Sequence, residues 1–512
     1  MRKLLLLSGL LALASAATAQ LRFVDAVVSR DKITRIDNVT YSQNYTVLYG
    51  DIDPTTAGNQ FQLESLKMDV YTPDDNSTNR PLVILLHSGS FLPRYLNQSP
   101  TGAKNDSHMV EMATQWAQRG YVVASIAYRQ GWNPQSMDET VRRSTIINAA
   151  YKGVQDLSAC IRFFKENVAA YGNTFSIDTS KIAVGGVGTG SYISSAYASL
   201  DRQDEITISK FRDPSTGAVF VDDKIWGDRF GFGGVTSAIP GVGGPFNKEN
   251  GNGYTSKAGV AFQIGGALGD SSWLEAGQIP LIWAHSVSDP FAPYTTGMVN
   301  VPGTPLKVVE VSGGYDIMKR ATSLGNTDAY KGKVMDDWTR AANVFNNGID
   351  GLLPIVGLVN SSGPYEWWDT AAIKLLPNPP YNVPAILGSG KATNPLMSKT
   401  RALTFIDTLM GYIAPRVAVT LGLQTSVGVE NVDLASNVTV YPNPAHGQVI
   451  IHNNWDNRTL EQVVFRDING KTIKSTAVHH NHIVEKLDMP AGIYIVEMQF
   501  NNGVGTTRLV VQ

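Results

Sequence analysis

A glycine-dense turn near the middle of the chain has the spacing of a turn that presents a nucleophile. The apolar run from Ile182 to Val184 is typical of a buried strand, and residues 192–200 have the small apolar composition of a packed helix. The turn between them reads Gly186-Val187-Gly188-Thr189-Gly190. A sharp strand-to-helix turn of the form G-x-S-x-G exposes a serine nucleophile at its centre. Here Gly188 occupies the nucleophile position, so the attacking hydroxyl is lost there.

Two neighbouring hydroxyls could be imagined in its place. Either would need small residues two positions away on both sides, because the turn closes tightly against the helix. Ser191 is flanked at that distance by Thr189 and Ile193, and Thr189 is flanked by the branched Val187. Neither fits, and Ser191 is predicted to lie in the first turn of the helix.

The elements around this turn alternate between strands and helices. Residues 81–87, 121–129 and 182–184 are apolar runs typical of buried parallel strands, and helices are predicted at 107–119 and 149–170. Extended segments within residues 21–72 predict leading antiparallel strands. Further strands are expected at 258–264, 280–285 and 306–311, and a closing helix at 399–419. The order favours an α/β fold with a doubly wound, mostly parallel sheet. The glycine-rich excursion at 201–256 could be a lid or an insertion.

The composition changes near residues 424–437, which we interpret as a linker. Short alternating strands fill residues 438–512 and predict a small all-β sandwich. The N-terminus has a basic start, a short apolar core and Ala17-Thr18-Ala19, which predicts a signal peptide over residues 1–19. The main domain is therefore expected over residues 20–423.

Composition excludes several classes of protein. A net charge of −2 gives no reason to expect binding to nucleic acid. No later run reaches about 18 apolar residues, so no transmembrane segment is predicted. Cys160 is the only cysteine, which rules out an internal disulfide, and its helical apolar setting predicts a buried thiol. No zinc or calcium motif stands out, and neither a metal nor a cofactor is expected.

The C-terminal segment resembles the sorting domain of type IX secretion. The resemblance rests on Val440-Tyr441-Pro442-Asn443-Pro444-Ala445, on Asp467-Ile468-Asn469-Gly470-Lys471, and on the run from Leu487 to Val496. It implies a partner, the type IX secretion machinery, recognised through residues 438–512. It also implies a protein that is secreted or held at the outer cell surface after transit through the periplasm.

Residues 60–420 resemble secreted carboxylesterases of the α/β-hydrolase fold. His87-Ser88-Gly89-Ser90-Phe91 is similar to the H-G-G-G-F motif, which implies that the backbone N–H groups of Gly89 and Ser90 belong to an oxyanion hole. The segment from His285 to Tyr294 resembles H-G-x-x-D-x-x-V-P and implies that Asp289 stands in the position of the triad acid. The family's histidine should follow near residues 360–368, which contain none.

These features predict a carboxylesterase-like protein without a working triad that binds a small ester or a carboxylate in the cleft. Candidate stacking surfaces are Trp132, Tyr294, Trp367 and Trp368. The alternative is an active carboxyl-ester hydrolase with a displaced catalytic set.

The displaced set would pair Ser88 or Ser90 with His87 or His285. Without a catalytic role, His87 and His285 are expected to be structural residues at the ends of core strands, and His108 is expected to be solvated. The glycine turn also matches a dinucleotide-binding loop loosely. It lies in mid-domain, however, rather than opening a first βαβ unit.

Overall fold

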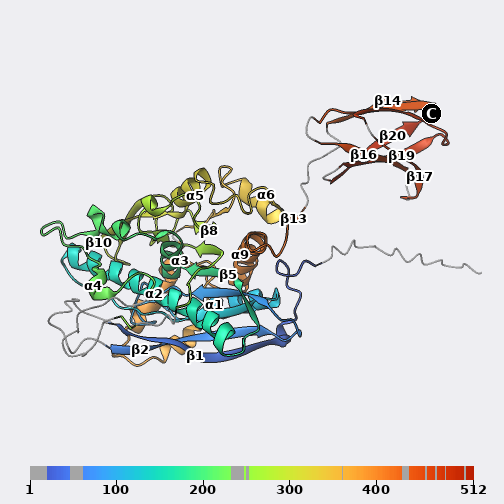
Figure 1. The fold of residues 1–512 in the computed structure, drawn as a ribbon. Coiled ribbons are helices and arrows are strands. Elements are labelled where there is room, and N and C mark those ends of the chain that lie inside the picture. The colour runs from blue at the N-terminus through green and yellow to red at the C-terminus, as the bar shows by residue number, and fades with distance from the viewer. Residues whose placement is uncertain are drawn as a thin grey trace, which may run out of the picture. The chain divides into compact units, whose positions relative to one another are not determined.

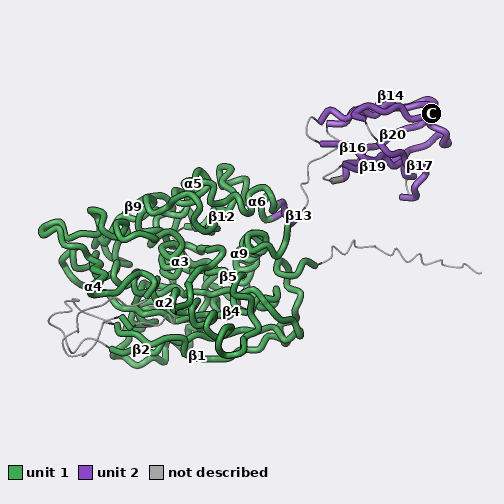
Figure 2. The backbone as a smooth tube through the Cα atoms, viewed as in Figure 1, with its two compact units in different colours: residues 1–334, 338–426 green, residues 335–337, 427–512 purple. Residues whose placement is uncertain are grey.

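The computed structural model describes residues 20–46, 62–231, 247–248, 253–359, 361–428, 437–455, 458–467, 470–478, 480–500 and 503–512. The chain divides into two compact units, shown in Figure 2: Met1–Val334 with Trp338–Ser426, and Met335–Asp337 with Val427–Gln512. The predicted signal peptide and residues 429–436 of the predicted linker lie outside the described residues.

An eight-stranded sheet forms the centre of the first unit (Figure 1), in the order β1-β2-β4-β3-β5-β6-β8-β12. The strands from β4 onward pair in parallel, whereas β1 pairs with β2 and β2 with β4 in antiparallel fashion. This arrangement confirms the predicted mostly parallel sheet with leading antiparallel strands. The strands are β1 (Ile33–Thr46), β2 (Gln62–Pro73), β3 (Arg80–Leu86), β4 (Val122–Ile126), β5 (Ile177–Val187), β6 (Val260–Ile264), β8 (Leu281–Ser286) and β12 (Leu352–Ile355).

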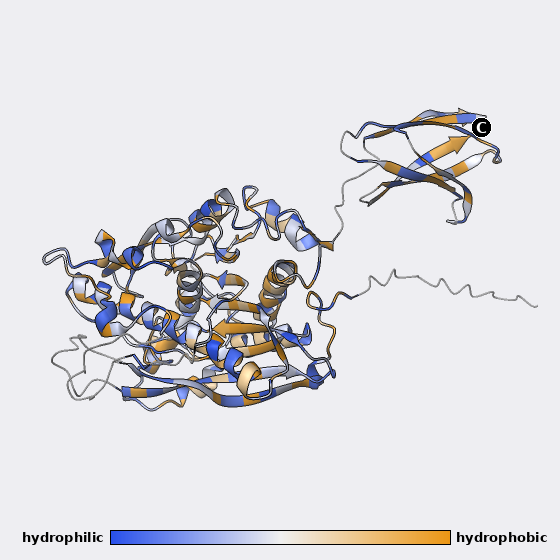
Figure 3. Cartoon of the chain, in the orientation of Figure 1, coloured by the Kyte–Doolittle hydropathy of each residue, from blue (hydrophilic) through white to orange (hydrophobic). Residues whose placement is uncertain are grey.

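Helices cover both faces of this sheet. Leu82, Ile84 and Leu86 of β3 share a buried cluster with α2 (Glu139–Ala170) and α3 (Thr189–Ser199). The alternate side chains of β3 point to the opposite face. There Trp116 of α1 (Ser107–Gln118) packs on Phe262 of β6 with ring centroids 5.4 Å apart. Figure 3 shows the hydrophobic strands enclosed between these layers, as a doubly wound sheet requires.

Helix α9 (Lys399–Thr420) also packs against α1 and the sheet. Within the described part of the chain it is the one helix long and apolar enough to cross a membrane, but 67% of its most apolar window is buried in the protein. Burial of this kind is typical of a core helix. Cys160 of α2 is likewise buried, as predicted.

Several elements differ from the sequence-based expectation. Strand β10 (Lys307–Gly313) belongs to a separate three-stranded sheet with β7 (Ala267–Leu268) and β9 (Gly297–Asn300), because it pairs with β9 in a local hairpin. Strand β12 was not anticipated, since it is only four residues long. Helix α2 begins ten residues earlier than predicted, where Asp138 caps it by accepting the N–H of Thr140.

The shorter elements of the first unit lie in the connections around the sheet. They are η1 (Arg30–Lys32), η2 (Gln203–Thr207), η3 (Ser209–Phe211), α4 (Asp223–Trp226), η4 (Ser271–Trp273), α5 (Gly314–Ser323), α6 (Asp337–Asn343), α7 (Thr370–Lys374) and α8 (Val383–Thr393). Two further short strands are β11 (Val334–Met335), at the boundary between the units along the chain, and β13 (Val427–Gly428), which belongs to the second unit.

The second unit is all-β, as predicted. Antiparallel pairing joins β18 to β15 and β15 to β14, and joins β17, β16, β19 and β20 in that order. One parallel contact, Ala445 with Val511, links the two sets. Val449, Phe465 and Val496 belong to its own buried core. The strands are β14 (Val438–His446), β15 (Gln448–Asn453), β16 (Leu460–Arg466), β17 (Thr472–Ala477), β18 (His482–Lys486), β19 (Gly492–Phe500) and β20 (Gly503–Val511).

Candidate active site

Five loops meet at one edge of the first unit's sheet. They follow β3, β5, β6, β8 and β12, which run parallel to one another and therefore end on the same side. Ligands of open α/β sheets bind at this carboxyl edge. The topology thus brings together residues that are up to about 280 positions apart in the chain.

The glycine turn has the backbone of a nucleophile elbow. Gly188 adopts φ 55° and ψ −113°, a backbone conformation that residues other than glycine rarely adopt. Its N–H donates to the Ile264 carbonyl at 2.9 Å. Ser191 lies in the first turn of α3, as predicted, and its hydroxyl donates to the Gly186 carbonyl at 2.7 Å. This hydroxyl also accepts the Ile264 N–H at 3.0 Å, so it ties the elbow to β6.

The Ser88 hydroxyl fills the space beside Gly188. A Cβ built on Gly188 would clash with Ser88 Oγ and would lie 3.0 Å from Ser88 Cβ. The three heavy atoms nearest to this Cβ all belong to Ser88. Strands β3 and β5 are neighbours, which explains the approach. A side chain on residue 188 and the present side chain of Ser88 therefore compete for one volume.

In the loop after β3, the carbonyl groups of Gly89 and Ser90 accept hydrogen bonds from side chains. Trp132 Nε1 donates to the Ser90 carbonyl at 2.7 Å, and Asn97 Nδ2 donates to the Gly89 carbonyl at 3.2 Å. Ser90 adopts φ 56°, and Gly89 approaches Gly102 so closely that a Cβ would lie 2.7 Å from the Gly102 Cα. In the described residues the N–H groups of Gly89 and Ser90 have no acceptor. These donors suit an oxyanion or carbonyl oxygen.

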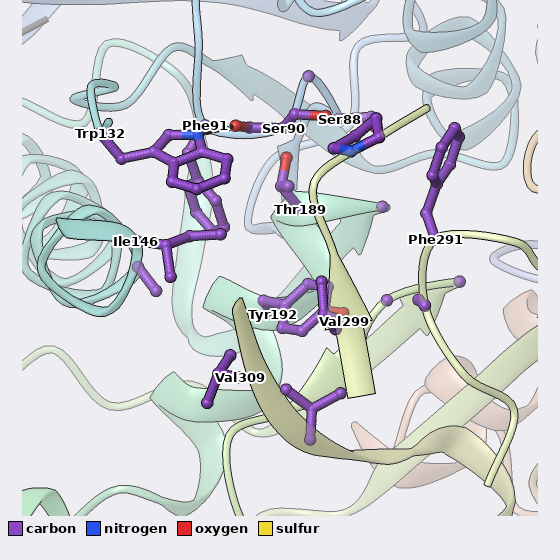
Figure 4. Close-up of a pocket in the computed structure, with 18 of the residues that line it drawn as sticks. Ser88, Ser90, Phe91, Trp132, Ile146, Thr189, Tyr192, Phe291, Val299 and Val309 are labelled. Carbon is purple, nitrogen blue, oxygen red and sulfur yellow. Dashed lines mark hydrogen bonds between the residues drawn. The ribbon is translucent and has the colours of Figure 1, made fainter. Parts of the chain in front are cut away.

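A cavity of about 200 Å³ opens at this edge. Figure 4 shows Ser88, Ser90 and Thr189 together at one end, and Val299 and Val309 at the other. Between the ends the lining is mainly aromatic and aliphatic. The described lining includes Phe91, Trp132, Ile146, Ile147, Tyr151, Val154, Tyr192, Phe211, Trp273, Phe291 and Val311.

Asp289 lines the cavity from the loop after β8. Its Oδ1 accepts the N–H groups of Phe291 at 2.8 Å and Ala292 at 3.1 Å. Its Oδ2 lies 3.7 Å from Nε2 of the buried His285, whose own hydrogen-bond contact is the Ala292 carbonyl at 3.1 Å. The side chain of Asp289 is only 4% exposed. It is a buried carboxylate with one oxygen left for a partner in the cavity.

The loop after β12, where the resemblance placed a histidine, contributes Tyr365 and Glu366 to the cavity. A Cβ built on Gly265 would lie 3.7 Å from Asp289 Oδ2 and 3.9 Å from the Tyr365 hydroxyl. Tyr365 is therefore the side chain from this loop that lies near the acid. Burial, with the charges of Glu366 and Asp289, raises the pKa of Tyr365 well above 10.

Glu366 is the second carboxyl group of the cavity. It accepts the Thr101 hydroxyl at 3.3 Å and lies 3.9 Å from His108 Nε2. Burial, with repulsion from Asp106 and Asp289, raises the pKa of Glu366 to about 8. Sequence reasoning gave no signal for it, since a lone glutamate in a loop is ordinary.

The expectation that His108 is solvated was wrong. His108 is fully buried at the start of α1, and its ring centroid lies 5.9 Å from that of Tyr365. In the described structure neither ring nitrogen has a hydrogen-bond partner. Burial lowers the pKa of His108 to about 4.

The other predicted residues divide between the cavity and the core. Trp132 lines the cavity, whereas Tyr294, Trp367 and Trp368 do not belong to its described lining. Tyr294 instead packs on His285, with ring centroids 5.5 Å apart. The described part of the 201–256 excursion contributes Ile206, Phe211 and Val221 to the lining.

Both histidines proposed for a displaced set are buried and have backbone partners. His87 Nδ1 lies 2.5 Å from the Ser88 carbonyl, its ring stacks on Tyr128, and burial lowers its pKa. His285 Nδ1 accepts the Gly314 N–H at 3.4 Å. Within the described residues, no histidine lines the cavity and no group of His, Cys, Asp and Glu side chains could hold a metal ion.

Comparison with known proteins supports a two-part chain. Residues 68–222 match the family model described as BD-FAE, and residues 439–512 match the secretion system C-terminal sorting domain. No curated protein matches the chain.

Similar solved structures include a thermophilic esterase from the Planctomycetes species Thermogutta terrifontis. Its propionate-bound form is 13% identical with a TM-score of 0.33, covering 64% of this chain and 85% of that one. The native form gives the same identity and TM-score and is covered over 84% of its length.

The chain therefore carries an esterase-like α/β-hydrolase domain of the BD-FAE type and a type IX secretion C-terminal sorting domain, which marks it as a secreted or cell-surface protein.

Proposed function

We propose that this exported protein uses the esterase-like cleft to bind a ligand and does not hydrolyse esters through a serine triad. The observation that carries the proposal is the pairing of Gly188 with Ser88. The elbow backbone persists at Gly188, while the hydroxyl of Ser88 occupies the space that a nucleophile's side chain needs.

A hydroxyl alone does not make a hydrolase. A serine attacks only when a base within hydrogen-bond reach takes its proton. The described lining of the cavity holds no histidine, and both His87 and His285 have backbone partners. Tyr365 cannot substitute as a base at neutral pH, because its neutral form is strongly favoured by burial.

The lining supports a ligand with a carbonyl group and an apolar body. The N–H groups of Gly89 and Ser90 suit a carbonyl oxygen, and the aromatic and aliphatic walls suit an apolar remainder. Of the two ligands expected from the sequence, the small ester is favoured over the carboxylate, because the buried carboxylate of Asp289 would repel a second negative charge.

A second candidate is an ester hydrolase in which Ser88 is the nucleophile. It is favoured by the position of Ser88 Oγ, beside the elbow and next to the oxyanion loop. Such an enzyme would need a base supplied by the substrate or by water, and its rate would be low.

The test is hydrolysis of p-nitrophenyl acetate and butyrate by the purified mature chain. Three proteins are compared: wild type, Ser88→Ala, and the triple variant Ser88→Gly with Gly188→Ser and Tyr365→His. We expect the first two to match a heat-denatured control. The triple variant has a serine at residue 188, room for its side chain because Ser88 is replaced by glycine, and an imidazole near Asp289. We therefore expect its activity to be at least about 100-fold higher than that of wild type.

Wild-type hydrolysis that disappears in Ser88→Ala would favour the second candidate over the first. Wild-type hydrolysis that survives in Ser88→Ala would contradict both. A triple variant that folds but stays inactive would mean that Tyr365 does not lie where the catalytic base is needed.

A further inference from the structure

We propose that the ligand of this cavity is an organic cation, a compound with one positively charged nitrogen on an apolar or aromatic body. The inference rests on the proposed binding function and specifies the charge of its ligand. It is carried by the side chains that line the cavity.

The described lining of the cavity contains acidic side chains and no basic ones. Asp289 and Glu366 are its carboxyl groups, and the described lining contains no lysine, arginine or histidine. The guanidinium of Arg94 is paired with Asp106 at 2.9 Å, so it is not available to offset them. A buried carboxylate without a counter-charge is costly. A cationic ligand would remove that cost, whereas an anionic one would add to it.

The Asp289 carboxylate has one oxygen that is free to face a ligand in the cavity. Asp289 Oδ1 accepts two backbone N–H groups, while Oδ2 lies on the side of Gly265, 3.7 Å from His285 Nε2. In a serine triad this oxygen stabilises the positive charge that forms on a histidine. Here no histidine of the described lining takes that part. A ligand's charged nitrogen can take it instead.

Aromatic rings supply the rest of the site. Phe91, Trp132 and Tyr192 lie along the cavity in Figure 4, and Trp273 also lines it. A cation over the face of such a ring is attracted by the ring quadrupole, most strongly when water is excluded. The same rings bury the apolar body of the ligand.

Cation binding is expected to depend on pH through Glu366. Burial and two neighbouring acids, Asp106 and Asp289, raise its pKa to about 8, so it is mostly protonated at neutral pH. The groups that face it are those acids, Tyr365 of its own loop, Thr101, and His108 of α1, which is neutral above about pH 4. A cation favours the ionised carboxylate, and binding should therefore release a proton.

The experiment is a calorimetric titration of the mature chain with three probes of similar size. Benzyltrimethylammonium is permanently positive, benzyl alcohol is neutral and phenylacetate is negative. We expect the cation to bind at least about tenfold more tightly than either of the others. Its affinity should rise by up to about tenfold per pH unit from pH 6.5 toward 8 and then level off.

Two variants separate the carboxyl groups. Asp289→Asn should weaken cation binding at every pH by at least about tenfold, and Glu366→Gln should abolish the pH dependence. Asp74→Asn is the matched control, because this acid is exposed and does not belong to the described lining of the cavity. It should change nothing.

The proposal is overturned if phenylacetate or benzyl alcohol binds as tightly as the cation, or if the cation shows no saturable binding at millimolar concentration. It is also overturned if Asp289→Asn binds the cation like wild type. These outcomes differ from failure of the proposed function, which would appear as ester hydrolysis by the same wild-type preparation.

Discussion

The competition between residues 88 and 188 for one volume can be measured as a coupling energy. The perturbation is Gly188→Ser, made alone and together with Ser88→Gly. Two effects act on the single variant. A non-glycine residue at φ 55° and ψ −113° costs about 1–3 kcal/mol in backbone strain. Overpacking against the Ser88 side chain costs about 1–3 kcal/mol more.

Ser88→Gly by itself should destabilise by about 1 kcal/mol, because glycine gains backbone freedom in the unfolded chain. In the double variant the strain at residue 188 remains, but the overpacking disappears. The double variant should therefore be more stable than the sum of the two single changes predicts, by about 1–3 kcal/mol.

The assay is urea unfolding of the full mature chain, followed by tryptophan fluorescence. The chain has two compact units, so the transition of the first unit is analysed separately. The matched control is the cycle of Gly188→Ser with Ser90→Gly, since Ser90 contributes none of the three atoms nearest a Cβ at residue 188. Its coupling energy should stay within about 0.5 kcal/mol of zero. Equal coupling in both cycles, or none in either, would refute the assignment of this volume to Ser88.

Two further predictions concern pH and export. Between pH 4.5, the ordinary pKa of a glutamate, and about pH 8, the raised pKa of Glu366, this side chain is protonated in the folded protein and ionised in the unfolded chain. The free energy of unfolding should therefore fall by about 1.4 kcal/mol per pH unit across this range. Glu366→Gln should flatten the slope between pH 6.5 and 8, above the range in which His108 titrates, and an unchanged slope in urea unfolding would argue against the raised pKa. Deletion of residues 439–512 should leave the protein in the periplasm of a host with type IX secretion, as cell fractionation would detect, whereas surface display of the truncated chain would contradict the role of the sorting domain.

The sequence was informative wherever a local pattern sets the structure. Alternating and continuous apolar runs located the strands that surround the elbow, and glycine spacing located the turn itself. The early antiparallel strands and the all-β C-terminal unit followed from the same patterns. Strand β12 was not predicted, because a four-residue apolar run is too short to be recognised as a strand from the sequence. The expectation for His108 was wrong because a polar residue at a helix start gives no sign of distant side chains that lie against it, here Tyr365 and Glu366.

What the sequence by itself determined is the sheet, the elbow turn, the absence of a serine at residue 188, and the sorting domain, because each depends on neighbours in the chain. Only the tertiary structure decided that the Ser88 hydroxyl lies against Gly188, that Tyr365 and Glu366 reach the region of Asp289, and that the described residues of the lining include two acids and no basic side chain. These relations join the ends of separate strands, and they depend on which strands are neighbours in the sheet. Strand order is fixed by the packing of the whole domain, which no local pattern encodes.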